Sequence, residues 1–141
     1  MILRHVGITV TDVEESLKFY RDLLGFEIVR TMDESGEHID NFSALTGVQV
    51  KTVKLRDESG GMIELLQYYS HPKKAENRNI THIGCSHFAL TIKNLDFILD
   101  EMGKKGYTIN SEPQLSPDGK VKLTFCKDPD GTLIELVEEL A

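Results

Sequence analysis

One sequence pattern occurs twice in this chain, and each copy carries a histidine and a glutamate at matching places. The first copy contains residues 5–10 (HVGITV) and 62–66 (MIELL), and the second contains residues 87–92 (HFALTI) and 133–137 (LIELV). Such a duplication constrains the fold, because each repeat must form the same supersecondary unit. Two equivalent units can together supply four metal-ligating side chains. The candidate ligands are His5, Glu64, His87 and Glu135.

The first copy has the pattern of a strand, a helix and three further strands. Residues 5–10 alternate between small or polar and branched apolar side chains, which is typical of a strand with two unlike faces. Asp12 and Glu15 match a capping box, and Gly25 matches the stop of a helix over residues 13–24. The remaining strands are predicted at residues 26–29, 49–55 and 62–69, with an irregular polar segment over residues 31–47.

The second copy repeats this order. Asn94 caps a predicted helix that ends at Gly106. The strands are predicted at residues 87–92, 107–109, 121–126 and 133–137, the last two joined by a turn at residues 128–131. The sequence therefore predicts an α+β fold with a single domain over residues 1–141. Module one covers about 1–70, a surface linker about 70–82 and module two about 83–141.

The two glutamates indicate why a metal ion belongs in such a fold. Glu64 and Glu135 each lie between apolar residues of a strand, and a buried carboxylate without a partner costs several kcal/mol. A divalent ion compensates two carboxylates, and two neutral imidazoles complete its shell. Nickel, zinc, cobalt or manganese in six-coordinate form would leave about two positions for a small-molecule substrate with adjacent oxygens. The other histidines, which lie outside the repeat or in predicted loops, are His38, His71 and His82.

Composition excludes several classes of partner. The formal net charge of −7 opposes binding to nucleic acid and to anionic membranes. No apolar run approaches the roughly 20 residues that span a bilayer, and the first residues lack the layout of a signal peptide. Cys85 and Cys126 do not form a C-x-x-C motif, which favours reduced structural thiols in a cytoplasmic protein.

Several segments resemble a known family. Residues 5–10, 16–20 and 24–26 resemble the opening signature of the vicinal oxygen chelate superfamily, specifically glyoxalase I-like proteins. Residues 63–65, 86–90 and 128–136 resemble its other ligand-bearing segments. The resemblance implies two βαβββ modules that form a cupped mixed sheet around a divalent metal (the glyoxalase/bleomycin resistance/dihydroxybiphenyl dioxygenase fold), commonly in a homodimer. The ligands that it implies are His5, Glu64, His87 and Glu135.

The same resemblance implies a metal-dependent lyase or isomerase of the glyoxalase I (lactoylglutathione lyase) type. Protons would move through a metal-stabilised enediolate, with Glu135 as the base and Glu64 as its counterpart. Thr9, Ser86 and residues 67–69 depart from the glutathione-binding pattern of the family, which leaves a coenzyme A thioester open as well.

Three alternatives follow. A methylmalonyl-CoA epimerase-like enzyme could use the basic linker residues Lys73, Lys74 and Arg78 to meet a phosphate. An extradiol-type dioxygenase prefers two histidines and one carboxylate on iron, so a second glutamate counts against it. A non-catalytic antibiotic-binding protein generally lacks the four ligands.

Overall fold

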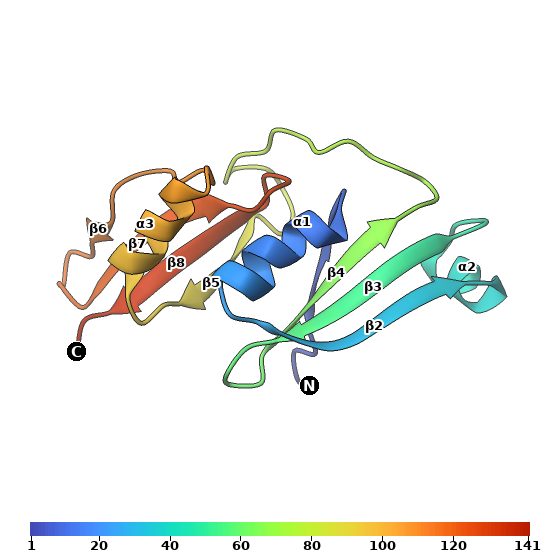
Figure 1. The fold of residues 1–141 in the computed structure, drawn as a ribbon, viewed down its shortest axis with the longest axis horizontal. Coiled ribbons are helices and arrows are strands. Elements are labelled where there is room, and N and C mark those ends of the chain that lie inside the picture. Colours follow the sequence, from blue (N-terminus) through green and yellow to red (C-terminus); the bar gives the residue numbers. More distant parts are fainter. The chain divides into compact units, whose positions relative to one another are not determined.

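Each half of the chain forms its own four-stranded mixed sheet in the computed structural model, which describes residues 1–141. The strand order is β1-β4-β3-β2 in the first sheet and β5-β8-β7-β6 in the second (Figure 1). By its internal contacts the chain divides into Met1–Ala75 and Glu76–Ala141, which we call module 1 and module 2. The predicted fold class, α+β with two modules of the same strand order, is confirmed.

Module 1 begins with the predicted strand and helix. β1 pairs in parallel with β4, while β3 runs antiparallel to both β4 and β2. Asp12 caps the helix, since its Oδ1 accepts the backbone N–H of Glu14 at 2.9 Å and that of Glu15 at 3.4 Å. The elements are β1 (Val6–Thr9), α1 (Val13–Leu17), the π-helical η1 (Lys18–Leu23), β2 (Glu27–Ser35), α2 (Glu37–Ser43), β3 (Gln49–Arg56) and β4 (Met62–Tyr68).

Module 2 has the same plan with a shorter outer edge. β5 pairs in parallel with β8, and β8 pairs antiparallel with β7. Asn94 caps its helix through a 3.1 Å hydrogen bond from the backbone N–H of Phe97. The elements are β5 (His87–Thr91), α3 (Leu95–Lys104), β6 (Gln114–Leu115), β7 (Val121–Lys127) and β8 (Leu133–Glu139). No helix in the structure has the length and apolar character needed to cross a membrane.

Two predicted segments are wrong. Residues 31–47 are not irregular, because β2 continues to Ser35 and α2 follows. Most of β2 is exposed and α2 buries only Ile39, so neither element has the apolar periodicity on which a sequence prediction depends. Residues 107–109 do not form a strand but contribute one isolated bridge, Ile109 to Cys126, and the edge strand is β6 instead.

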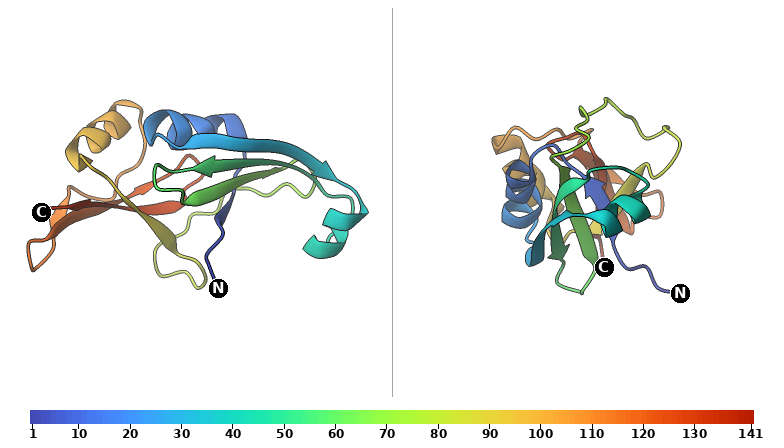
Figure 2. Two further views of the ribbon diagram at one scale, coloured as in Figure 1. Left: turned by 90° about the horizontal axis from the view of Figure 1, so that it is seen from below. Right: turned by 90° about the vertical axis from the view of Figure 1, so that its right-hand side faces the viewer.

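Each helix is tied to the strand that carries the candidate glutamate. The backbone N–H of Val13 donates to Gln67 Oε1 at 2.8 Å, and the backbone N–H of Leu95 donates to Glu138 Oε2, also at 2.8 Å. Gln67 and Glu138 are at the same position in their modules, three residues after the candidate glutamate. Both helices contact that strand, α1 with β4 and α3 with β8 (Figure 2). Each link holds the helix against the strand. It also gives a hydrogen-bond acceptor to a backbone N–H of the first helical turn, which has no partner within the helix.

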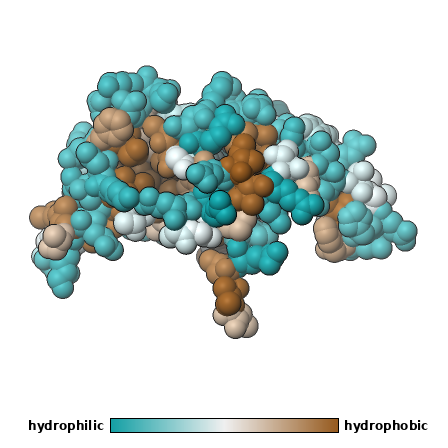
Figure 3. All heavy atoms as spheres, turned by 60° about the horizontal axis from the view of Figure 1, so that its bottom comes forward, coloured by the Kyte–Doolittle hydropathy of each residue, from teal (hydrophilic) through white to brown (hydrophobic).

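Branched aliphatic residues of the strands alternate with the candidate ligands and form the core. Ile63, Leu65, Ile134 and Leu136 are all buried on the sheet faces opposite to the two glutamates. The N-terminal apolar residues do not take part, since Met1, Ile2 and Leu3 are exposed. Apolar groups stand out among polar ones on the molecular surface (Figure 3). The strand period therefore places the candidate ligands on the face that the helices do not cover.

Candidate metal centre

In module 1 the candidate ligands come from β4, which carries Glu64, and from His5, which directly precedes the neighbouring parallel strand β1. Gly7 of β1 is in register with Glu64 of β4, so the His5 side chain, two residues earlier, is on the same face as Glu64. His5 Nε2 lies 3.7 Å from Glu64 Oε2, and the two side chains are 30% and 14% exposed. Lys54 of β3 is directly opposite Glu64, and its Nζ lies 3.8 Å from the same carboxylate oxygen.

In module 2 the second pair has the same geometry. Ala89 of β5 is in register with Glu135 of β8, which places His87 in the position that His5 has in module 1. His87 Nε2 lies 3.3 Å from Glu135 Oε2, and the side chains are 28% and 24% exposed. Insertions between the ligands therefore change the loop lengths but not the register of the pair.

The spacing within each pair fits two donors of one metal ion. Nitrogen and oxygen ligands lie about 2.1 Å from such ions, so two of them are about 3.0 Å apart at an octahedral angle and about 3.4 Å apart at a tetrahedral one. The measured separations of 3.7 Å and 3.3 Å need only a small adjustment. Imidazole and carboxylate suit nickel, zinc, cobalt and manganese. Each module supplies one such pair, and the structure contains no cluster of three or more His, Cys, Asp or Glu side chains able to hold a metal.

Residues beside the pairs differ between the modules. The Ser86 hydroxyl lies 2.7 Å from His87 Nδ1, an arrangement that directs Nε2 toward Glu135, with the donor set by the imidazole tautomer. The Phe125 ring packs edge-on against His87, with centroids 4.9 Å apart and planes at 73°. Phe125 is in register with Glu135, as Lys54 is with Glu64.

Sequence reasoning missed Lys54 and Phe125, although a signal was present. Each lies ten residues before its glutamate (64 − 54 and 135 − 125), at the hairpin position directly opposite. Aligning the two hairpins, rather than only the strands with ligands, would have paired these residues.

Two of the three remaining histidines, His38 and His82, have local partners. The His82 ring contacts the backbone of Asn79, with Nδ1 3.0 Å from its nitrogen. His38 packs against Phe42 with ring centroids 6.1 Å apart. Neither of these contacts involves a candidate ligand.

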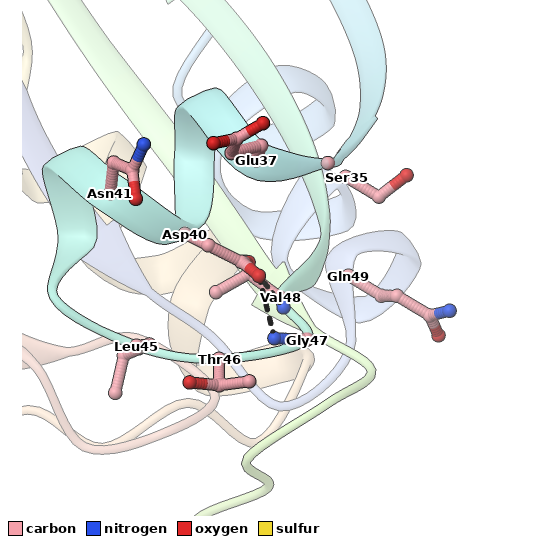
Figure 4. A pocket seen from close by; sticks show the side chains of 10 residues that line it. Ser35, Glu37, Asp40, Asn41, Leu45, Thr46, Gly47, Val48 and Gln49 are labelled. Atoms are coloured by element: carbon pink, nitrogen blue, oxygen red, sulfur yellow. Dashed lines mark hydrogen bonds between the residues drawn. The ribbon is translucent and has the colours of Figure 1, made fainter.

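A pocket of about 480 Å³ lies in module 1 between α2 and the start of β3, and no candidate ligand lines it (Figure 4). Its acidic residue Asp40 is already engaged, because its two carboxylate oxygens accept the backbone N–H groups of Gly47 and Val48 at 2.8 Å each. These hydrogen bonds lower the pKa of Asp40 below its usual value. The Asp40 carboxylate thus holds the loop at Gly47 and Val48, which forms one side of the pocket. The pocket is not part of the candidate metal centre.

Both cysteines are free thiols. Cys126 of β7 is fully buried, and burial, with a smaller effect of Asp128, raises the pKa of its thiol to about 12. Cys85 is exposed. Cys126 faces away from Glu135, because its neighbour Phe125 is the residue opposite that glutamate.

The sequence between residues 2 and 136 matches the model of the glyoxalase/bleomycin resistance protein/dioxygenase superfamily. The chain belongs to this superfamily, which confirms the resemblance seen in the sequence. It is 30% identical over 139 residues to a probable lactoylglutathione lyase of Synechocystis, a match that covers 98% of this chain and 95% of that protein. It spans less than half the length of several plant relatives named lactoylglutathione lyase.

Solved structures agree on the fold. A glyoxalase family protein from Bacillus cereus superimposes with a TM-score of 0.90 at 20% identity, covering 99% of this chain and 94% of that one. The trypanothione-dependent glyoxalase I of Leishmania major gives a TM-score of 0.67 at 25% identity, covering 96% of this chain and 84% of that one.

Proposed function

We propose that this protein is a metal-dependent lyase or isomerase of the glyoxalase I type. It would move a proton between adjacent carbons of a small molecule that bears neighbouring oxygens. The observation that carries the proposal is that each module holds one donor pair, His5 with Glu64 and His87 with Glu135, in the same register and with a spacing inside each pair that suits two ligands of an ion. Relatives named lactoylglutathione lyase support the choice of reaction.

In this proposal His5, Glu64, His87 and Glu135 together bind one divalent ion, nickel, zinc, cobalt or manganese. The proposal holds for pairs from one chain and for pairs from two chains of a homodimer. When bound, the ion supplies Lewis acidity, which favours negative charge on the substrate oxygens. The two carboxylates balance its charge, and the two imidazoles complete the donor set.

Glu135 is the proposed base, and Glu64 is its counterpart. Glu135 is opposite Phe125 across the hairpin, and its Oε2 lies 3.3 Å from His87 Nε2. Glu64 also has Lys54 beside it, 3.8 Å from its oxygen. Glu135 has no lysine beside it, so its carboxylate can take up a proton from one carbon and return it to the neighbouring carbon. Glu64 would first have to break its contact with the Lys54 ammonium group.

The experiment measures metal binding and reaction on the same protein. Chelator-treated protein is titrated with nickel and with zinc by calorimetry. It is then assayed in deuterated water with the methylglyoxal–glutathione hemithioacetal and with methylmalonyl-CoA. We expect calorimetry to show one metal ion for each set of four ligands. Chelation should abolish turnover of the hemithioacetal, and added metal should restore it. His5→Ala and His87→Ala should lose metal binding. His82→Ala, which removes a histidine away from both pairs, is the matched control.

Two results would reject parts of this proposal. Wild-type protein that binds neither metal would reject the metal centre. Turnover of methylmalonyl-CoA alone would replace the lyase by an epimerase that uses the same ligands.

A further inference from the structure

A row of charged residues crosses the sheet of module 1 on the face that carries Glu64. Glu64 of β4 is opposite Lys54 of β3, and Lys54 is opposite Arg30 of β2. The Thr52 hydroxyl donates to Glu34 Oε2 at 3.1 Å, which confirms that alternate residues of β2 and β3 share this face. The row therefore places two cationic side chains next to one carboxylate.

The charges of this row do not balance. Lys54 pairs with Glu64 at 3.8 Å, whereas Arg30 is exposed and forms no salt bridge. Like charges directly opposite each other on neighbouring strands destabilise a sheet. If a metal ion engages Glu64, Lys54 also loses much of the attraction of its only anionic partner. The site would then hold two cations that face each other without an anion between them.

Module 2 shows that the fold does not require these cations. The matching row there runs from Ala89 through Glu135 to Phe125, and it places an aromatic ring where module 1 has Lys54. The cations of module 1 are thus a feature of one module and not of the repeated architecture. A site with cations in one module and an aromatic ring in the other suits an unsymmetrical ligand that is anionic at one end.

We propose that Lys54 and Arg30 form a subsite for a carboxylate group of the substrate, next to the oxygens that the metal would hold. This inference rests on the proposed function, and it narrows the substrate class to molecules that carry a carboxylate in addition to the vicinal oxygens. Neighbouring strands are about 4.8 Å apart, so the carboxylate lies roughly 5–10 Å from Glu64. A short carbon chain between the vicinal oxygens and the carboxylate covers this distance.

The donors suit this group. Lysine offers three N–H donors and arginine five, in a planar fork that can bind both oxygens of a carboxylate. Lys54 is 22% exposed, so its ammonium group is partly shielded from water, whereas Arg30 is at the exposed end of the row. We therefore expect Lys54 to contribute more to binding than Arg30.

The test compares two metal-chelating probes that differ by one carboxymethyl group. Acetohydroxamic acid has vicinal oxygens alone, and N-hydroxysuccinamic acid has the same oxygens and a carboxylate. Calorimetry with nickel-loaded protein should show that the carboxylated probe binds wild type about tenfold more tightly or better. Lys54→Met should remove this preference, and Arg30→Met should reduce it about threefold, with acetohydroxamic acid unaffected in both. Lys51→Met, on the opposite face of β3, is the control that should change neither affinity.

Three other results would overturn either the carboxylate subsite or the proposed function. Equal affinity of wild type for the two probes overturns the carboxylate subsite and leaves the metal centre intact. Loss of both probes in Lys54→Met also overturns it, because Lys54 would then act only through Glu64. If nickel-loaded wild type binds neither probe, the proposed function fails first. Because Arg30 is exposed, Arg30→Met keeps its fold, and it tests the subsite even if Lys54→Met does not fold.

Discussion

The two modules hold the same pair of donors in the same register, yet the residues around the pairs differ. His5 and Glu64 have an ammonium group beside them, while His87 and Glu135 have a hydroxyl and an aromatic ring. Both helices are tied to their ligand strands by a side chain three residues after the glutamate. The repeat thus preserves the positions of the donors and leaves their neighbours free to diverge. This difference allows the two halves to have unequal roles in one reaction.

The largest effect is expected when each glutamate is replaced by glutamine, which tests whether the two modules have unequal roles in the reaction. Glu135→Gln should lower kcat roughly hundredfold or more, because a general base contributes about 10²–10⁴-fold. Glu64→Gln should lower kcat by a smaller factor, about tenfold, and should weaken metal binding. Steady-state kinetics at saturating metal, with calorimetry for the metal, measures both. Equal losses of kcat would show that the two carboxylates share the role of base.

A second comparison concerns the core beneath the pairs. Leu55 and Cys126 occupy the same hairpin position, opposite Ile63 and Ile134, and both are fully buried. Leu55→Ala should lower the free energy of unfolding by about 3 kcal/mol through the cavity that it leaves. Cys126→Ala removes one sulfur atom and should cost about 1 kcal/mol. Urea unfolding followed by circular dichroism measures both, and a larger loss in Cys126→Ala would show that the two cores are not equivalent.

The helix links should differ in strength. Glu138 Oε2 accepts the Leu95 N–H, and Lys122 Nζ lies 3.4 Å from the same oxygen. Hydrogen bonds to charged groups contribute more than neutral ones, so Glu138→Ala should lower the free energy of unfolding by about 2 kcal/mol and Gln67→Ala by about 1 kcal/mol. Added salt should reduce the first loss but not the second. The same salt dependence in both variants would contradict a charged link in module 2.

Alkaline pH should lower the stability of module 2 in part through Cys126. Its pKa rises from an ordinary 9.0 to about 12 in the folded protein, so stability present below pH 9 is lost as the pH rises toward 12. The loss should be on the order of 1 kcal/mol at pH 10. Cys126→Ala should remove this part of the pH dependence of the free energy of unfolding in urea titrations at pH 8 and pH 10. At pH 8 a thiol reagent should modify Cys85 only, and rapid modification of both thiols in folded protein would contradict the burial of Cys126.

The smallest expected effect comes from making β1 more like β5. Gly7 is opposite Glu64 where module 2 has Ala89 opposite Glu135. A methyl group at Gly7 would lie 3.5 Å from Leu66 Cδ1, an ordinary contact. Gly7→Ala should therefore raise the free energy of unfolding by about 0.5 kcal/mol, since it restricts the unfolded chain. A loss above about 1 kcal/mol in thermal unfolding would show that β1 requires glycine.

The predictable part of this structure lies where apolar periodicity is strong. The alternation around Glu64 and Glu135, and the caps Asp12 and Asn94, gave the inner strands and the helices within a few residues. The outer part of module 1 was not predictable, because β2 is mostly exposed and α2 buries only Ile39. Solvent on both sides of a segment removes the pattern on which such predictions depend.

For the candidate site, the sequence identified the donors but not their surroundings. A histidine and a glutamate recur at matching places, so the pairs could be named. The roles of Lys54 and Phe125 depend on cross-strand register, which the hairpin turns and not the residue types determine. Ser86 was visible only as a departure from a family pattern, and its contact with His87 gave it a physical meaning.

The unequal length of the modules has a consequence for protein engineering. Module 1 carries its additional residues in α2 and the long β2–β3 arm, at the far edge of the sheet from β1, and the register of its donors matches that of module 2. New loops or helices can therefore be grafted onto this arm to change which ligands the protein admits. The inner strands would continue to hold the histidine and the glutamate in place.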